Sequence, residues 1–112
     1  MGIKLIFVKM NYENYSEREK QILQKVTEII QTELHPNKII LFGSRAKGSF
    51  HKHSDFDFAV DVNEPDNKIR RKLLNRIERI SGLYKIDIVF LSSVDSDFKN
   101  IILNSGELLY AR

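Results

Sequence analysis

The most constraining feature of the sequence is a stretch of strict alternation, DFDFAVDV at residues 55–62. Successive side chains of a β-strand point to opposite faces of the sheet. The phenylalanines and valines therefore share one face, while the three aspartates share the other face with Ala59. A second apolar stretch, residues 85–91, carries Asp87 between two isoleucines. Acidic residues are depleted in strands, so acids at these positions need an explanation.

The spacing of these acids predicts a cluster of carboxylates. Asp55 and Asp57 point the same way, and Asp87 joins them if the two strands lie side by side. Like charges at close range are unfavourable, and a bound Mg²⁺ relieves the repulsion. The alternative is that the acids form the hydrated face of a half-exposed sheet. We accept that alternative for Asp61, which lies at the far end of the strand, next to a turn.

Length and composition limit the class of protein. The 112 residues suit one domain, and 42% hydrophobic with 29% charged residues is a globular balance. The absence of cysteine excludes disulfides and thiolate metal sites. The net charge of +3 lies within the ordinary range. The apolar run at residues 3–8 is too short for a secretory signal or a membrane span, so we expect a cytoplasmic protein without membrane contact.

Helical periodicity alternates with the strands. A helix is expected over residues 16–35, begun by a capping box of Ser16 and Glu19 and ended by Pro36. A second helix is expected from Asp66 to Ile80, and its predicted inward residues are Ile69, Leu73, Leu74, Ile77 and Ile80.

A last helix is expected from Ser96 to Asn104, closed by Gly106 in the usual C-terminal position. Buried strands are expected at 39–42, 55–62 and 85–91, with a final strand in ELLYA at 107–111. These elements predict one small α+β domain, α/β-like in element order, with a mixed sheet flanked by helices. We expect it to span residues 15–112, after an N-terminal arm or short strand within 1–14.

A glycine-serine step follows the first buried strand. Gly43 allows a sharp turn and the close approach of a phosphate, and Ser44 can cap the short helical turn that SRAKG begins. Arg45 and Lys47 add positive charge, either toward a phosphate or as solvated surface residues. Gly48 then lets the chain leave the turn.

The glycine-serine step and the two aspartates of the next strand have a recognisable spacing. Gly43-Ser44, ten residues, and then Asp55-Phe56-Asp57 resemble the GSx10DxD signature of the polymerase β-like nucleotidyltransferase superfamily. LFGSRAKG and SDFDFAV, with the later acid in KIDIVFL, are similar to its minimal nucleotidyltransferase (MNT) branch. The resemblance runs from about Glu17 to the C-terminus.

The resemblance implies a role for each matching residue. Gly43 and Ser44 would hold a nucleoside triphosphate, with Arg45 and Lys47 as further nucleotide-binding residues. Asp55, Asp57 and Asp87 would be the catalytic acids and would bind two Mg²⁺ ions, with ATP as the substrate. Attack on the α-phosphate would expel pyrophosphate and leave a nucleoside monophosphate on a hydroxyl.

The acceptor is the open question, because a chain of this length has no room for an acceptor-binding domain. MNT proteins resemble antitoxins that transfer AMP to a tyrosine of a HEPN-domain toxin, and we expect this activity first. A non-catalytic antitoxin that acts by contact is one alternative. A homo-oligomer that modifies a small molecule such as an aminoglycoside is another. Nucleic acid is not expected as a partner.

Other polar residues have simpler explanations. His51 and His53 lie in a polar loop and are expected to face solvent. Asp95 and Asp97 precede a helix, where acids complement free backbone amides. The basic run at residues 68–72 is expected to form mainly a solvated helix face, although it also suits an acidic partner or RNA.

Overall fold

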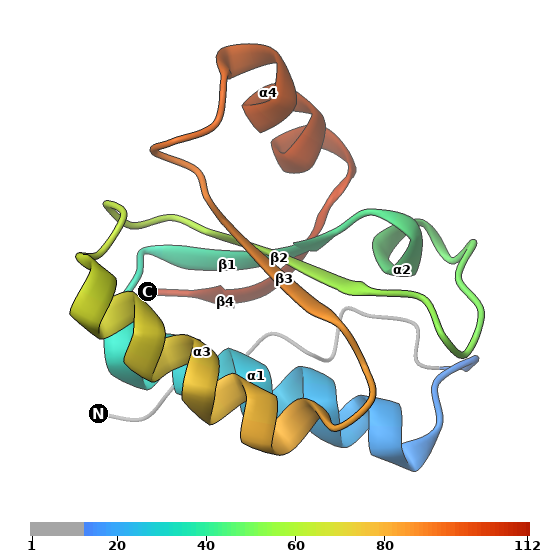
Figure 1. Ribbon diagram of the computed structural model, residues 1–112. Helices are drawn as coiled ribbons and strands as arrows, with labels where there is room; N and C mark the ends of the chain where they lie inside the picture. Colours follow the sequence, from blue (N-terminus) through green and yellow to red (C-terminus); the bar gives the residue numbers. More distant parts are fainter. Residues whose placement is uncertain (1–12) are drawn as a thin grey trace.

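The computed structural model describes residues 13–112, and the arm or strand expected at residues 3–8 lies outside them. Helices and strands alternate along this part of the chain (Figure 1). They are α1 (Glu17–Leu34), β1 (Lys38–Phe42), α2 (Ser44–Lys47), β2 (Phe56–Val60), α3 (Asn67–Ser81), β3 (Ile86–Phe90), α4 (Ser96–Ser105) and β4 (Glu107–Ala111). The expected order of elements is confirmed, including the final strand.

The four strands form one mixed sheet in the order β3-β2-β1-β4. β1 runs antiparallel to both β2 and β4, whereas β2 and β3 are parallel and are joined through α3. The parallel register places Asp57 directly opposite Asp87, and the antiparallel register places Phe42 on the other side of Asp57. The predicted α+β domain with a mixed sheet is therefore confirmed.

The two faces of the sheet are covered unequally, as Figure 1 shows. Helices α1 and α3 pack against one face, where Phe56, Phe58 and Val60 are fully buried in the main core. On the opposite face, α4 covers a smaller apolar cluster that includes Ala59 and Ile102. The alternation predicted for β2 is thus confirmed, and its acidic side lies on the less covered face.

The helix ends follow the predicted chemistry. Ser16 and Glu19 form the reciprocal capping box of α1, and the helix ends at Leu34 with His35 in a left-handed conformation. Asp95 caps α4 by accepting a hydrogen bond from the Phe98 amide, as expected of an acid before a helix.

Two features of the helices correct the sequence analysis. On α3, Leu73 and Ile77 are buried, but Ile69 and Leu74 are 42% and 41% exposed, because α3 packs beside the edge strand β3 and no further element of residues 13–112 covers them. Gly106 closes α4 with a φ of −79°, not in the left-handed region. A side chain there would lie 2.4 Å from Cγ2 of Ile40, so close packing requires the glycine.

Between residues 13 and 112, no helix combines the length and apolar character needed to cross a bilayer.

Candidate active site

Three carboxylates converge at one end of β2 and β3. Asp57 lies in β2 opposite Asp87 of β3, and Asp55 directly precedes β2 on the same face as Asp57. One carboxylate oxygen from each residue can be chosen so that all three lie within 4.8 Å of one another. Asp55 and Asp87 are 43% and 42% exposed. The sequence-predicted cluster is therefore present, and two of its members, Asp55 and Asp87, are open to solvent.

The cluster strongly disfavours three negative charges. Burial raises the pKa of Asp57 to about 6, assisted by the negative charge of Asp87, a hydrogen bond with Asp87 and the charge of Asp55. Oxygen donors this close together suit a divalent cation such as Mg²⁺, which binds through carboxylates and substrate phosphates. The donor set therefore fits the metal that the sequence predicts.

Gly43 brings the backbone directly against Asp57. It precedes α2 with a φ of 75°, and a Cβ atom at this position would lie 2.5 Å from Oδ2 of Asp57. Both the left-handed conformation and the close approach require glycine. This turn places Ser44, the first residue of α2, beside the acidic cluster. Ser44 does not cap α2 as the sequence suggested, because Gly43 occupies the capping position and no side chain provides the bond.

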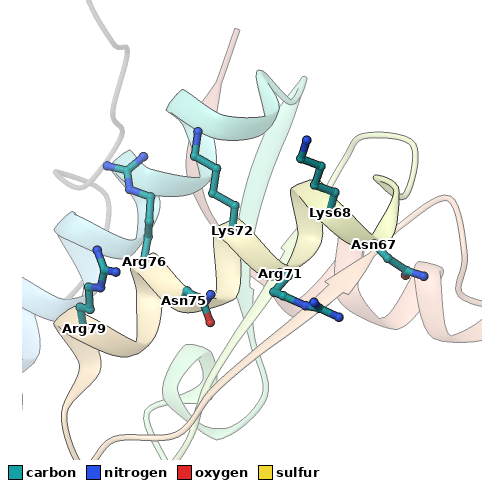
Figure 2. A pocket seen from close by; sticks show the side chains of 7 residues that line it. All are labelled: Asn67, Lys68, Arg71, Lys72, Asn75, Arg76 and Arg79. Carbon is teal, nitrogen blue, oxygen red and sulfur yellow. The ribbon is translucent and has the colours of Figure 1, made fainter.

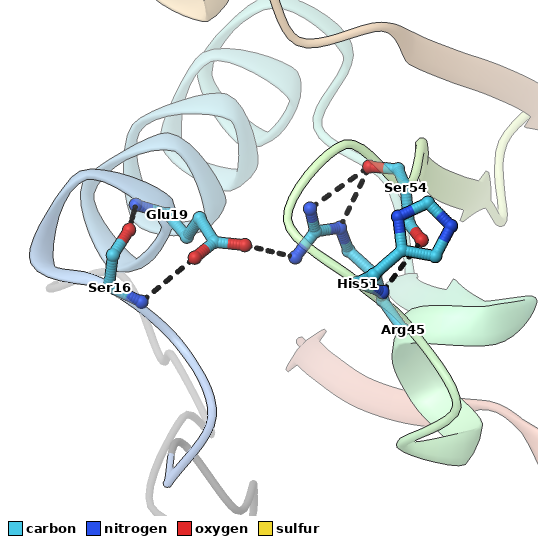
Figure 3. Close-up of polar contacts among 5 residues, drawn as sticks. All are labelled: Ser16, Glu19, Arg45, His51 and Ser54. Atoms are coloured by element: carbon cyan, nitrogen blue, oxygen red, sulfur yellow. Dashed lines mark hydrogen bonds and ion pairs between the residues drawn. The ribbon is translucent and has the colours of Figure 1, made fainter.

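Arg45 is not the solvated surface residue that the sequence allowed, and its burial argues against the expected contact with a nucleotide. Its side chain is fully buried, and Nη1 lies 2.6 Å from Oε2 of Glu19 on α1. Nε and Nη2 both donate to the carbonyl oxygen of Ser54, the residue before Asp55 (Figure 3). The guanidinium also lies 3.9 Å from the ring centre of Phe56, on the face opposite Asp57. Arg45 therefore links α1 to the loop that precedes β2 and contains Asp55.

The remaining predicted loop residues are exposed. Lys47 ends α2 on the surface, and Gly48 follows in a left-handed conformation at the point where the chain leaves the turn. His51 and His53 are exposed, as expected, and the His51 backbone amide donates to the Ser54 hydroxyl.

One charged neighbour of the cluster escaped the sequence analysis. Nζ of Lys85 lies 3.9 Å from Oδ2 of Asp55 and 3.9 Å from Oδ2 of Asp87. Lys85 precedes Asp87 by two residues, so the same alternation that aligned the acids could have placed this lysine beside them.

A separate hollow of about 660 Å³ lies along α3. Figure 2 shows the side chains that line it extending from α3, and the basic ones include Lys68, Arg71 and Arg79. Lys72 and Arg76, which also line it, pair with Glu33 of α1. The hollow contains no carboxylate and belongs to a helix that covers the other face of the sheet. It is therefore separate from the acidic cluster.

Comparison with known proteins agrees with this geometry. The polymerase β nucleotidyltransferase family matches residues 24–112. A candidate protein adenylyltransferase of Methanocaldococcus jannaschii is 32% identical over 82 residues, which cover 70% of this chain and 81% of the relative. The chain belongs to the polymerase β nucleotidyltransferase family, and it is a nucleotidyltransferase.

Solved structures show the same fold. A crystal structure of a toxin–antitoxin complex with AMP-PNP has a TM-score of 0.68 and 25% identity, covering 80% of this chain and 73% of that chain. The structure of a candidate minimal nucleotidyltransferase has a TM-score of 0.66 and 20% identity, covering 82% of this chain and 95% of that one. The fold is therefore that of a minimal nucleotidyltransferase.

Proposed function

We propose that this protein transfers AMP from ATP to a hydroxyl of a partner protein, using Mg²⁺ held by Asp55, Asp57 and Asp87. The observation that carries the proposal is the convergence of three carboxylates beside the Gly43 turn. The relative in Methanocaldococcus jannaschii, named for protein adenylyltransferase activity, supports the choice of AMP and of a protein acceptor.

The turn after β1 suits the triphosphate. Gly43 presents backbone without a side chain beside Asp57, so a phosphate can approach the carboxylates closely. Ser44 offers its hydroxyl at the same turn, and Lys47 offers an exposed positive charge one helical turn further along. Arg45 has no part in this binding, because its guanidinium is buried against Glu19.

The carboxylates suit the transfer step. Bound Mg²⁺ would lower the pKa of the attacking hydroxyl and stabilise the negative charge on the leaving oxygen. Asp87 lies on the side of β2 away from Gly43, so it is placed to receive the acceptor hydroxyl and its proton. The hydroxyl oxygen forms a bond to the α-phosphorus. The bond between the α-phosphorus and the oxygen that bridges to the β-phosphate breaks, and pyrophosphate leaves.

A tyrosine of a HEPN-domain toxin is the proposed acceptor, which would make the protein an antitoxin. The MNT signature supports this choice, as does the fold shared with the toxin–antitoxin complex that contains AMP-PNP. The acidic cluster is 42–43% exposed at Asp55 and Asp87, so it is accessible to a side chain of another protein.

The decisive experiment is intact-mass measurement after incubation with ATP, Mg²⁺ and the protein encoded beside this one. The expected result is an adenylyl adduct on a tyrosine of the neighbour, absent when Asp57→Asn is used. Asp61→Asn is the matched control, because it makes the same change directly after β2 and outside the carboxylate cluster. A stable complex without any adduct would contradict the transfer proposal and favour neutralisation by contact.

A further inference from the structure

Lys85 occupies a fixed position beside the acidic cluster. Its carbonyl oxygen accepts a hydrogen bond of 3.0 Å from the Phe56 amide, which ties its backbone to the start of β2. Its side chain is 68% exposed, yet Nζ lies 3.9 Å from a carboxylate oxygen of Asp55 and 3.9 Å from one of Asp87. The backbone of Lys85 is therefore held in place, and its exposed ammonium group reaches two of the three acids.

The alternation of the two strands creates this arrangement. Lys85 and Asp87 are two residues apart and share a face, as do Asp55 and Asp57 on the neighbouring strand. Four charged side chains thus form a compact group, and within residues 13–112 Lys85 is the one cation that pairs with these carboxylates within 4.0 Å.

We propose that Lys85 is a tethered cation that competes with a divalent metal ion for Asp55 and Asp87. This inference rests on the metal site of the proposed function. A divalent ion bound by these carboxylates repels the Lys85 ammonium, which must then move away. The long, exposed side chain can do so at little cost, because surface ion pairs contribute only weakly. Lys85 consequently lowers the affinity for the metal and stabilises the cluster when no metal is bound.

The sheet order argues for competition rather than for binding of the triphosphate. β2 separates β3 from β1, so Lys85 and the Gly43 turn lie on opposite sides of the strand that carries Asp57. The expected phosphates lie at the Gly43 turn. Lys85 therefore acts on the metal site and not on the phosphates, from the side where the acceptor is expected to approach.

Titration with Mn²⁺ alone tests the inference without nucleotide or acceptor. The electron paramagnetic resonance signal of free Mn²⁺ measures how much of the ion remains unbound. Lys85→Gln should bind Mn²⁺ about two- to fivefold more tightly, the range expected for loss of exposed ion pairs. Lys85→Arg keeps the charge and should bind like the unaltered protein. Lys25→Gln is the matched control, since Lys25 is exposed on α1, which covers the other face of the sheet.

Thermal unfolding in EDTA supplies a second, opposite readout. Lys85→Gln should lower the melting temperature without metal, because the carboxylates lose their counter-charge. If Lys85 merely supported the fold, Lys85→Gln would lower both the melting temperature and the affinity for Mn²⁺. Unchanged or weaker Mn²⁺ binding by Lys85→Gln overturns the inference and leaves the proposed function standing. If the unaltered protein binds no more Mn²⁺ than Asp57→Asn, the metal site itself is wrong and the inference falls with it.

Discussion

Two glycines with a positive φ differ in ψ, which is −156° at Gly43 and 6° at Gly48, and in their surroundings. Gly43 has a φ of 75° and Gly48 a φ of 76°, so a side chain strains the backbone at both positions. An added Cβ at Gly43 would lie 2.5 Å from Oδ2 of Asp57, whereas at Gly48 no atom of the described residues 13–112 lies within 4 Å. The close contact with Asp57 is therefore particular to Gly43, whereas a positive φ is common to both glycines.

Gly43→Ala and Gly48→Ala should each lower the free energy of unfolding by about 1–3 kcal/mol, from backbone strain. Gly43→Ala alone should reduce nucleotide transfer, at least tenfold, because Asp57 must move away from the new methyl group. Urea unfolding and the rate of adenylyl transfer measure the two effects. Equal loss of transfer in both variants would show that the turn, and not the contact with Asp57, controls the site.

At the scale of the elements, Arg45 connects parts of the chain that are far apart in sequence. It joins α2 to α1 through Glu19 and to the loop before β2 through Ser54. Burial alone raises the pKa of Glu19, but hydrogen bonds from Ser16 and Arg45 outweigh burial and lower it. Because the Arg45–Glu19 ion pair is buried, replacing either residue leaves the charge of the other buried without its full counter-charge.

Arg45 and Lys47 lie two residues apart on α2, but substitution of Arg45 should affect stability and substitution of Lys47 should affect the KM for ATP. Arg45→Lys retains the charge but not the paired donors to Ser54, so it should destabilise the protein by about 1–3 kcal/mol. Lys47→Gln should leave stability unchanged, since Lys47 is exposed, and should raise the KM for ATP several-fold. Urea unfolding and steady-state kinetics distinguish them. An unchanged stability in Arg45→Lys, together with a raised KM, would restore Arg45 as a nucleotide ligand.

Features that depend on one element could be predicted from the sequence. The alternation of β2 located Asp55 and Asp57, and the capping box located the start of α1. The position of Arg45 could not be predicted, because its partner Glu19 lies 26 residues earlier and the surrounding rings come from separate segments. The exposure of Leu74 likewise depends on β3 being an edge strand, which periodicity within α3 cannot reveal.

At the scale of the whole molecule, the two sides of the sheet have separate tasks. Helices α1 and α3 bury the apolar side of β2, which stabilises the domain. The other side gathers three carboxylates, and burial together with the neighbouring negative charges raises the pKa of Asp57. Gathering these carboxylates therefore lowers the stability of the protein when no cation is bound, and this cost depends on pH.

The direction of that dependence follows from Asp57. Its pKa is about 6 in the folded protein against an ordinary value of 3.8, so the folded protein binds more protons than the unfolded chain between these values. The free energy of unfolding should therefore fall as pH rises from about 4 to about 6. Asp57→Asn removes the titrating group, so in EDTA at pH 7.5 it should be more stable than the unaltered protein. The gain should be on the order of 1–2 kcal/mol, reduced by partial exposure from the full shift.

Urea unfolding in EDTA between pH 4 and pH 8 measures this gain, which should shrink toward zero near pH 4, where Asp57 is protonated. Asp61→Asn, outside the cluster, should follow the unaltered protein throughout. Saturating Mg²⁺ should reverse the order at pH 7.5, because it stabilises only a chain that retains Asp57. If Asp57→Asn were less stable at pH 7.5 in EDTA, the carboxylates would not be repelling one another, and the electrostatic reason for a metal at this site would be lost.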